Sequence, residues 1–85
     1  MLRLIKFMLP TCADCRALEP VIEDVLKDNP EVLYSEFNAL EDDEAVGYDI
    51  RSVPTIIVQK DGEEVGRIDH MTDESSIRKL LASAG

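Results

Sequence analysis

Two strand-like segments separated by one helical segment occupy the first part of the chain, and this order strongly constrains the fold. The apolar run 2–9 predicts a strand that ends at Pro10, and residues 32–37 predict a second strand. Between them apolar side chains recur at helical spacing over 15–29, until Asn29-Pro30 stops the helix. A strand, helix and strand of this length pair their strands in parallel through a right-handed crossover, which predicts an α/β fold.

The rest of the chain extends this unit by two strands and two helices. The pattern predicts a helix at 43–48, strands at 54–59 and 64–68 around a turn at 60–63, and a last helix capped by Thr72 or Asp73. The last helix has an apolar face formed by Ile77, Leu80, Leu81 and Ala84. The expected fold is a βαβαββα arrangement, a four-stranded mixed sheet flanked by three helices, in one domain over 1–85.

Composition excludes several classes of partner. A net charge of −9 argues against nucleic acid and against anionic membrane surfaces, because proteins bind both through clusters of Lys and Arg. The acidic run 41–44 is expected to be a solvated helix start. The apolar run at the N-terminus is too short for a signal peptide, so we expect a cytoplasmic protein, and we expect it to be a monomer.

Cys12 and Cys15 carry the only obvious chemistry of the chain. They are separated by two residues and lie where the first strand gives way to the first helix, so they can close into a small reversible disulfide. At a helix N-terminus, free N–H groups and the helix dipole lower the pKa of a cysteine thiol. The sequence therefore predicts a nucleophilic Cys12, with Cys15 placed one turn later to resolve a mixed disulfide.

Four motifs together resemble the thioredoxin and glutaredoxin superfamily. They are Cys12-Ala13-Asp14-Cys15 at a helix start, Pro20 five residues after the second cysteine, Val53-Pro54-Thr55, and the hairpin turn Lys60-Asp61-Gly62-Glu63. The resemblance covers nearly the whole chain from the family's second strand onward. In size the chain is similar to the small, glutaredoxin-sized thioredoxins of phages and archaea.

The resemblance implies a thiol–disulfide oxidoreductase that acts in electron transport. In such proteins the thiolate, here Cys12, attacks a substrate disulfide, and the second cysteine, here Cys15, releases the reduced product. The family's cis-proline corresponds to Pro54, and the substrate would contact Ser52, Val53, Pro54 and Met71. Protein disulfides are the implied substrates, and a thioredoxin-reductase-type flavoprotein or glutathione is the implied electron donor. No cofactor beyond the redox-active disulfide, and no metal, is implied.

Two charged positions depart from the family pattern. Thioredoxins bury an Asp six residues before the first cysteine, where this chain has Lys6, and they usually have a Lys where Glu36 falls. The two charges are thus exchanged, and both residues are candidates for transferring the proton of Cys15. The alternative for Lys6 is that it lies near a strand end and reaches water. Thioredoxins also carry Trp and Gly-Pro where this chain has Thr11 and Ala13-Asp14.

Two other functions are compatible with parts of the pattern. Small size favours a glutathione-dependent glutaredoxin, whereas the segment Asp69-His70-Met71 lacks the glycines that such proteins use for glutathione. Copper carriers also place a Cys-x-x-Cys motif after their first strand, but their element order is βαββαβ. A structural zinc site would need four ligands, and the two cysteines with His70 supply three.

Overall fold

The computed structural model describes all residues 1–85 and contains one four-stranded sheet. The strands are β1 (Leu2–Met8), β2 (Leu33–Asn38), β3 (Thr55–Lys60) and β4 (Glu63–Ile68), in the spatial order β2-β1-β3-β4. β1 pairs in parallel with β2, whereas the β1–β3 and β3–β4 pairs are antiparallel. The mixed sheet expected from the sequence is therefore confirmed.

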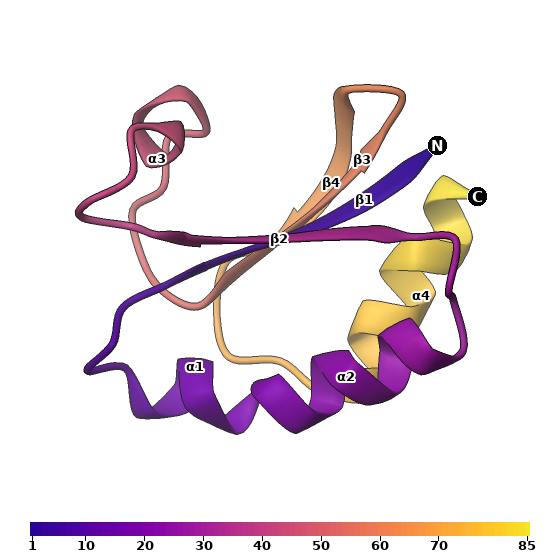
Figure 1. The fold of residues 1–85 in the computed structure, drawn as a ribbon, viewed down its shortest axis with the longest axis horizontal. Helices are drawn as coiled ribbons and strands as arrows, with labels where there is room; N and C mark the ends of the chain where they lie inside the picture. The colour runs from indigo at the N-terminus through magenta and orange to yellow at the C-terminus, as the bar shows by residue number, and fades with distance from the viewer.

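Helices cover both faces of the sheet. The helices α1 (Ala13–Ala17), α2 (Glu19–Lys27) and α4 (Glu74–Ala84) lie on one side, and the short α3 (Glu44–Gly47) lies on the other (Figure 1). Side chains alternate along β1 accordingly. Leu4 packs into the larger core cluster beneath α2 and α4, whereas Ile5 and Phe7 pack into a smaller cluster with Ala45 of α3. Lys6 shares the Leu4 face and so points towards α1 and α2.

The first helical segment is broken rather than continuous, which corrects the single helix expected over 15–29. α1 ends at Ala17, Leu18 lies between the helices, and Pro20 lies in the first turn of α2. A proline lacks the N–H that a helix interior requires, but the first turn leaves its N–H groups without helical partners, so the chain restarts a helix there. The break leaves the buried Leu18 in the larger core cluster.

Local signals in the second half of the chain also form the expected elements. Asp61 and Gly62 both adopt positive φ, 53° and 86°, in the tight turn between β3 and β4. Asp73 caps α4, because its carboxylate accepts a hydrogen bond from the N–H of Ser76 at 2.8 Å. Gly66 lets α4 approach β4 closely, since a Cβ there would stand 2.6 Å from Leu80 Cδ1. None of the helices has the length and apolarity needed to cross a lipid bilayer.

Candidate active site

Three loops meet at one edge of the sheet. Phe7 near the end of β1 pairs with Thr55 at the start of β3, and Ile56 pairs with Ile68 at the end of β4. The loop that carries the cysteines, the loop before β3 and the loop after β4 therefore leave the sheet on the same side. Topology thus gathers the cysteines, the Ser52–Pro54 segment and Met71 in one region.

Cys12 and Cys15 form a disulfide, with their Cα atoms 5.2 Å apart. Cys12 is the N-cap of α1, and its sulfur accepts a hydrogen bond from the Cys15 N–H at 3.1 Å. Cys12 is partly exposed, whereas Cys15 is completely buried. An attacking group from solvent can therefore approach only the Cys12 side of the bond.

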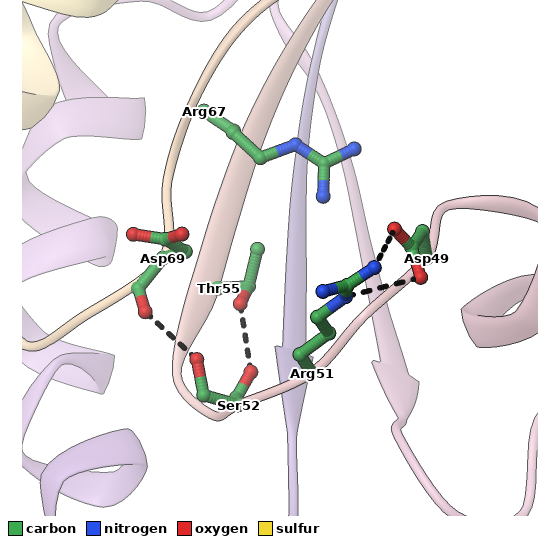
Figure 2. A pocket seen from close by; sticks show the side chains of 6 residues that line it. All are labelled: Asp49, Arg51, Ser52, Thr55, Arg67 and Asp69. Atoms are coloured by element: carbon green, nitrogen blue, oxygen red, sulfur yellow. Dashed lines mark hydrogen bonds and ion pairs between the residues drawn. The ribbon is translucent and has the colours of Figure 1, made fainter.

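The loop before β3 is fixed by two side-chain hydrogen bonds (Figure 2). Thr55 donates its hydroxyl to the Ser52 carbonyl at 2.7 Å, and Ser52 donates its hydroxyl to the Asp69 carbonyl at 2.8 Å. Between Ser52 and Thr55, the Val53–Pro54 peptide bond is cis, and Pro54 is buried. The second of these bonds also ties the loop before β3 to the loop after β4.

This loop separates a polar hollow from an apolar one. The polar hollow has a volume of about 280 Å³ and is the one drawn in Figure 2, lined by Asp49, Arg51, Ser52, Thr55, Arg67 and Asp69. Its two guanidinium groups are already paired, Arg51 with Asp49 and Arg67 with Glu64. The apolar hollow, of about 130 Å³, is lined by Leu9, Ala39, Leu40, Ile50, Arg51, Ser52 and Val53.

Sequence reasoning missed the apolar hollow. One signal was available, because Leu40 is an apolar residue directly before an acidic run, and the structure leaves 83% of it exposed. The hollow forms only when segments far apart in sequence, the loop after β1 and the connection between β2 and β3, come together. Met71, which was predicted to contact substrate, is 42% exposed beside the same group of loops. His70 is also exposed, and its Nδ1 lies 2.8 Å from the Met71 carbonyl.

Lys6 lies behind the disulfide and is only 1% exposed. Its Nζ donates a hydrogen bond to the Cys15 carbonyl at 2.7 Å and lies 3.5 Å from Glu36 Oε2. The alternative that Lys6 reaches water from a strand end is therefore wrong. Lys6 sits mid-strand, with Glu36 as its parallel neighbour on β2 and Ile56 as its antiparallel neighbour on β3.

Glu36 connects this buried charge to the surface. Its side chain is 37% exposed, and its Oε2 also accepts a hydrogen bond from the Tyr34 hydroxyl at 2.9 Å. Partial burial, together with the hydrogen bond and the negative charge of Glu36, raises the pKa of Tyr34 above its ordinary value. The phenol thus stays protonated and donates to the carboxylate.

Comparison with known proteins identifies the family. The thioredoxin family model matches residues 1–83. The chain belongs to the thioredoxin family. It is 33% identical over 79 residues to a thioredoxin of Chlamydia pneumoniae, covering 92% of this chain and 78% of that protein. It is also 33% identical over 86 residues to chloroplastic thioredoxin M4 of Arabidopsis thaliana, covering 92% of this chain and 44% of that protein.

A solved structure agrees with this assignment. A mutant thioredoxin from Halobacterium salinarum NRC-1 superposes with a TM-score of 0.89 at 28% identity, covering 98% of this chain and 74% of that one. With the Cys12–Cys15 disulfide, family membership makes the chain a thiol–disulfide oxidoreductase, and the thioredoxin interpretation fits better than the glutaredoxin one. With α1 and α2 counted as one broken helical segment, the element order is βαβαββα, which contradicts the copper-carrier arrangement. No group of three or more His, Cys, Asp or Glu side chains is arranged to hold a metal ion.

Proposed function

We propose that this thioredoxin-family chain reduces protein disulfides, with Cys12 as the nucleophile and Cys15 as the resolving thiol. The observation that carries the assignment is the unequal burial of the two cysteines, because Cys12 is partly exposed and Cys15 is completely buried. A large substrate can reach only the exposed sulfur. The buried Cys15 sulfur can instead attack Cys12 within the same domain.

The reaction is a two-step thiol–disulfide exchange. The Cys12 thiolate attacks one sulfur of the substrate disulfide, so a mixed disulfide forms and the other substrate sulfur leaves as a thiolate. Cys15 then loses its proton and attacks Cys12 Sγ, which closes the Cys12–Cys15 bond and releases the second substrate thiolate. The substrate gains two electrons, and the chain loses two to become the disulfide form.

An extended substrate segment would pair with the backbone of Val53. Neither the N–H nor the carbonyl of Val53 takes part in a hydrogen bond within the chain. Such free groups in an extended segment favour pairing with another strand. Ser52 and Pro54 fix this segment, and Met71 with the apolar hollow beside Val53 would contact substrate side chains.

Lys6 and Glu36 remain candidates for handling the proton of Cys15. A charged ammonium has no lone pair, so Glu36 is the acceptor within this pair, and its exposure lets it exchange the proton with water. Glu36→Gln should then slow the resolving step near neutral pH, and raising the pH should restore the rate. If the resolving step of Glu36→Gln keeps the pH dependence of the unmodified chain, Glu36 is not the acceptor of the Cys15 proton.

The electron donor is proposed to be a thioredoxin-reductase-type flavoprotein. The better fit to thioredoxins than to glutaredoxins supports this choice, and so does the absence of the glutathione-binding glycines at Asp69-His70-Met71. NADPH-coupled reduction of a protein disulfide tests it when run in parallel with a thioredoxin reductase and with glutathione plus glutathione reductase. Turnover with the first system alone is expected. Turnover only with glutathione would overturn the choice of donor.

A reducing compartment is also part of the proposal. A dithiol that must be regenerated by a reductase suits the cytosol, where structural disulfides are rare. We propose that the chain acts there as a monomer. Its M4 relative is named as chloroplastic, which is likewise a compartment inside the cell. Fractionation of cells and sedimentation of the purified chain test these two statements separately.

A further inference from the structure

A buried positive charge stands directly behind the redox-active disulfide, and the exchange steps do not use it as a nucleophile or as an acceptor. The Lys6 ammonium donates a hydrogen bond to the Cys15 carbonyl at 2.7 Å, and only 1% of the residue is exposed. Its ion-pair partner Glu36 lies 3.5 Å away but is 37% exposed. Water therefore screens the carboxylate far more than it screens the ammonium.

We propose that Lys6 is a positioning residue that sets the redox potential of the Cys12–Cys15 pair. Its hydrogen bond holds the backbone of α1 at Cys15, and its charge stabilises the thiolates of the reduced form. The inference rests on the proposed redox function of the two cysteines. It does not depend on which group accepts the Cys15 proton, because it concerns the equilibrium between the two redox states rather than a rate.

A nearby cation acts differently on the two redox states of the cysteine pair. Reduction adds two electrons to the Cys12–Cys15 bond and, with two protons, yields two thiols, of which the helix N-terminus favours the thiolate form of Cys12. An external thiol such as glutathione supplies the electrons, and two molecules of it become one disulfide. The sulfurs are uncharged in the oxidised state, so a nearby cation stabilises only the reduced state. The Lys6 charge should therefore make the disulfide easier to reduce and the Cys12 thiol easier to ionise.

The other charges near this site are few and are more exposed. Asp14 on α1 is a solvent-exposed carboxylate next to the cysteines, Arg16 directly after Cys15 is a solvent-exposed cation, and Glu19 at the start of α2 is also exposed. On β2, Glu36 accepts a hydrogen bond from the neutral Tyr34 phenol. Each carboxylate opposes Lys6, but each also contacts water. Lys6 is thus the only charged side chain that is buried in the whole molecule.

Two substitutions should shift the same equilibria in opposite directions. Lys6→Met replaces the cation with a neutral side chain of similar length. We expect it to shift the equilibrium with glutathione roughly tenfold towards the disulfide form, which corresponds to a redox potential about 30 mV more negative. The Cys12 thiol should then ionise at a pH about one unit higher. Glu36→Gln leaves Lys6 without its counter-charge, so both quantities should move the other way. Lys6→Arg keeps the charge and should restore most of the original values.

The test is a redox titration in glutathione buffers, followed by a thiolate titration by ultraviolet absorbance. A matched control is Lys60→Met, which removes an exposed lysine at the far end of the sheet and should leave both values unchanged. Opposite shifts for Lys6→Met and Glu36→Gln support the proposal. Unchanged values, or shifts of the same sign in both variants, overturn it.

Two other results of these titrations have different meanings. If Lys6→Met does not fold, Lys6→Gln takes its place in the same comparison, because its neutral amide removes the charge and can still donate a hydrogen bond to the Cys15 carbonyl. If the unmodified chain forms no reversible Cys12–Cys15 disulfide in the glutathione buffers, the proposed function itself fails. In that case the effect of Lys6 is refuted along with the function on which it rests.

Discussion

The Lys6 ammonium and the Cys15 carbonyl are joined by a buried hydrogen bond of 2.7 Å, which ties the middle of β1 to the first turns of α1. The same ammonium is 3.5 Å from Glu36, its direct neighbour in the parallel β1–β2 register. A residue of the central strand therefore touches both the redox helix and an edge strand. Its charge should matter for stability as well as for the redox equilibrium.

Removing one member of the Lys6–Glu36 pair should destabilise the fold only moderately. A fully buried charge left without its partner costs about 3 to 5 kcal/mol. Because Glu36 is partly exposed and water can replace it, we expect about 1 to 2 kcal/mol for Glu36→Gln. In a Lys6→Met background the same change should cost under about 0.5 kcal/mol. Urea denaturation of the two single variants and the double variant measures this coupling, and additive effects would show that the two residues do not interact.

Tyr34 gives the fold a dependence on high pH. Its folded-state pKa is raised by partial burial and by the hydrogen bond to Glu36, so the unfolded chain loses this proton at a lower pH than the folded chain does. The stability it contributes is fully present below about pH 10, the ordinary tyrosine value, and falls as the pH rises above it. Tyr34→Phe should flatten the fall in unfolding free energy between about pH 10 and 11. Tyr48→Phe is the matched control, and an equal effect of both changes would contradict this assignment.

The negative charge of Asp14 should oppose ionisation of the Cys12 thiol. It is an exposed carboxylate in the first turn of α1, two residues after Cys12. Asp14→Asn keeps the shape and removes the negative charge, so the pKa of the Cys12 thiol should fall by about half a unit or less and the disulfide should become slightly more oxidising. The comparison variant is Asp24→Asn on the exposed side of α2. If the thiolate titrations of the two variants coincide with that of the unmodified chain, solvent screens the Asp14 charge completely.

Ser52 should affect substrate use through the loop before β3. Its hydroxyl donates to the Asp69 carbonyl at 2.8 Å and so joins the two loops on either side of the proposed substrate segment. Ser52→Ala removes this bond, which contributes about 1 kcal/mol. We expect that amount to be lost from the stabilisation of the bound transition state, so kcat/KM for a protein disulfide should fall roughly fivefold. Ser83→Ala is a close control, since Ser83 makes the same type of bond to the Leu80 carbonyl on α4. If the two variants have equal kcat/KM values, the Ser52 hydrogen bond does not contribute to substrate binding.

The sequence predicted the order of the strands along the chain, the parallel pairing of β1 with β2 and the β3–β4 hairpin, but not the antiparallel pairing of β1 with β3. Alternation along β1 and the Asp61-Gly62 turn are local signals, and local signals determine strands and hairpins. The break at Leu18 was not predicted, although Pro20 stands within the segment expected to be one helix. Apolar spacing continues through the break, because Cys15 of α1, Leu18 and Ile22 of α2 are all buried. Periodicity alone therefore cannot distinguish one kinked helix from two.

The two cysteines were found from spacing alone, whereas the surroundings of Lys6 needed the structure. Strand alternation shows that Lys6 shares a face with Leu4, but it does not show which backbone group lies above that face. The Cys15 carbonyl comes within reach only because Cys15 is completely buried between α1 and the sheet. The apolar hollow near Leu40 depends in the same way on loops that meet only in the folded chain.

Cys12 and Cys15 have different roles in the proposed reaction, and trapping of the mixed disulfide distinguishes them. Cys15→Ser removes the resolving sulfur, so the intermediate should accumulate with the substrate attached to Cys12, as identified by mass spectrometry of non-reduced peptides. Cys12→Ser should trap nothing, because the Cys15 sulfur is completely buried. Accumulation of substrate on Cys15 in the Cys12→Ser variant, with none on Cys12 in the Cys15→Ser variant, would reverse the roles assigned to the two cysteines.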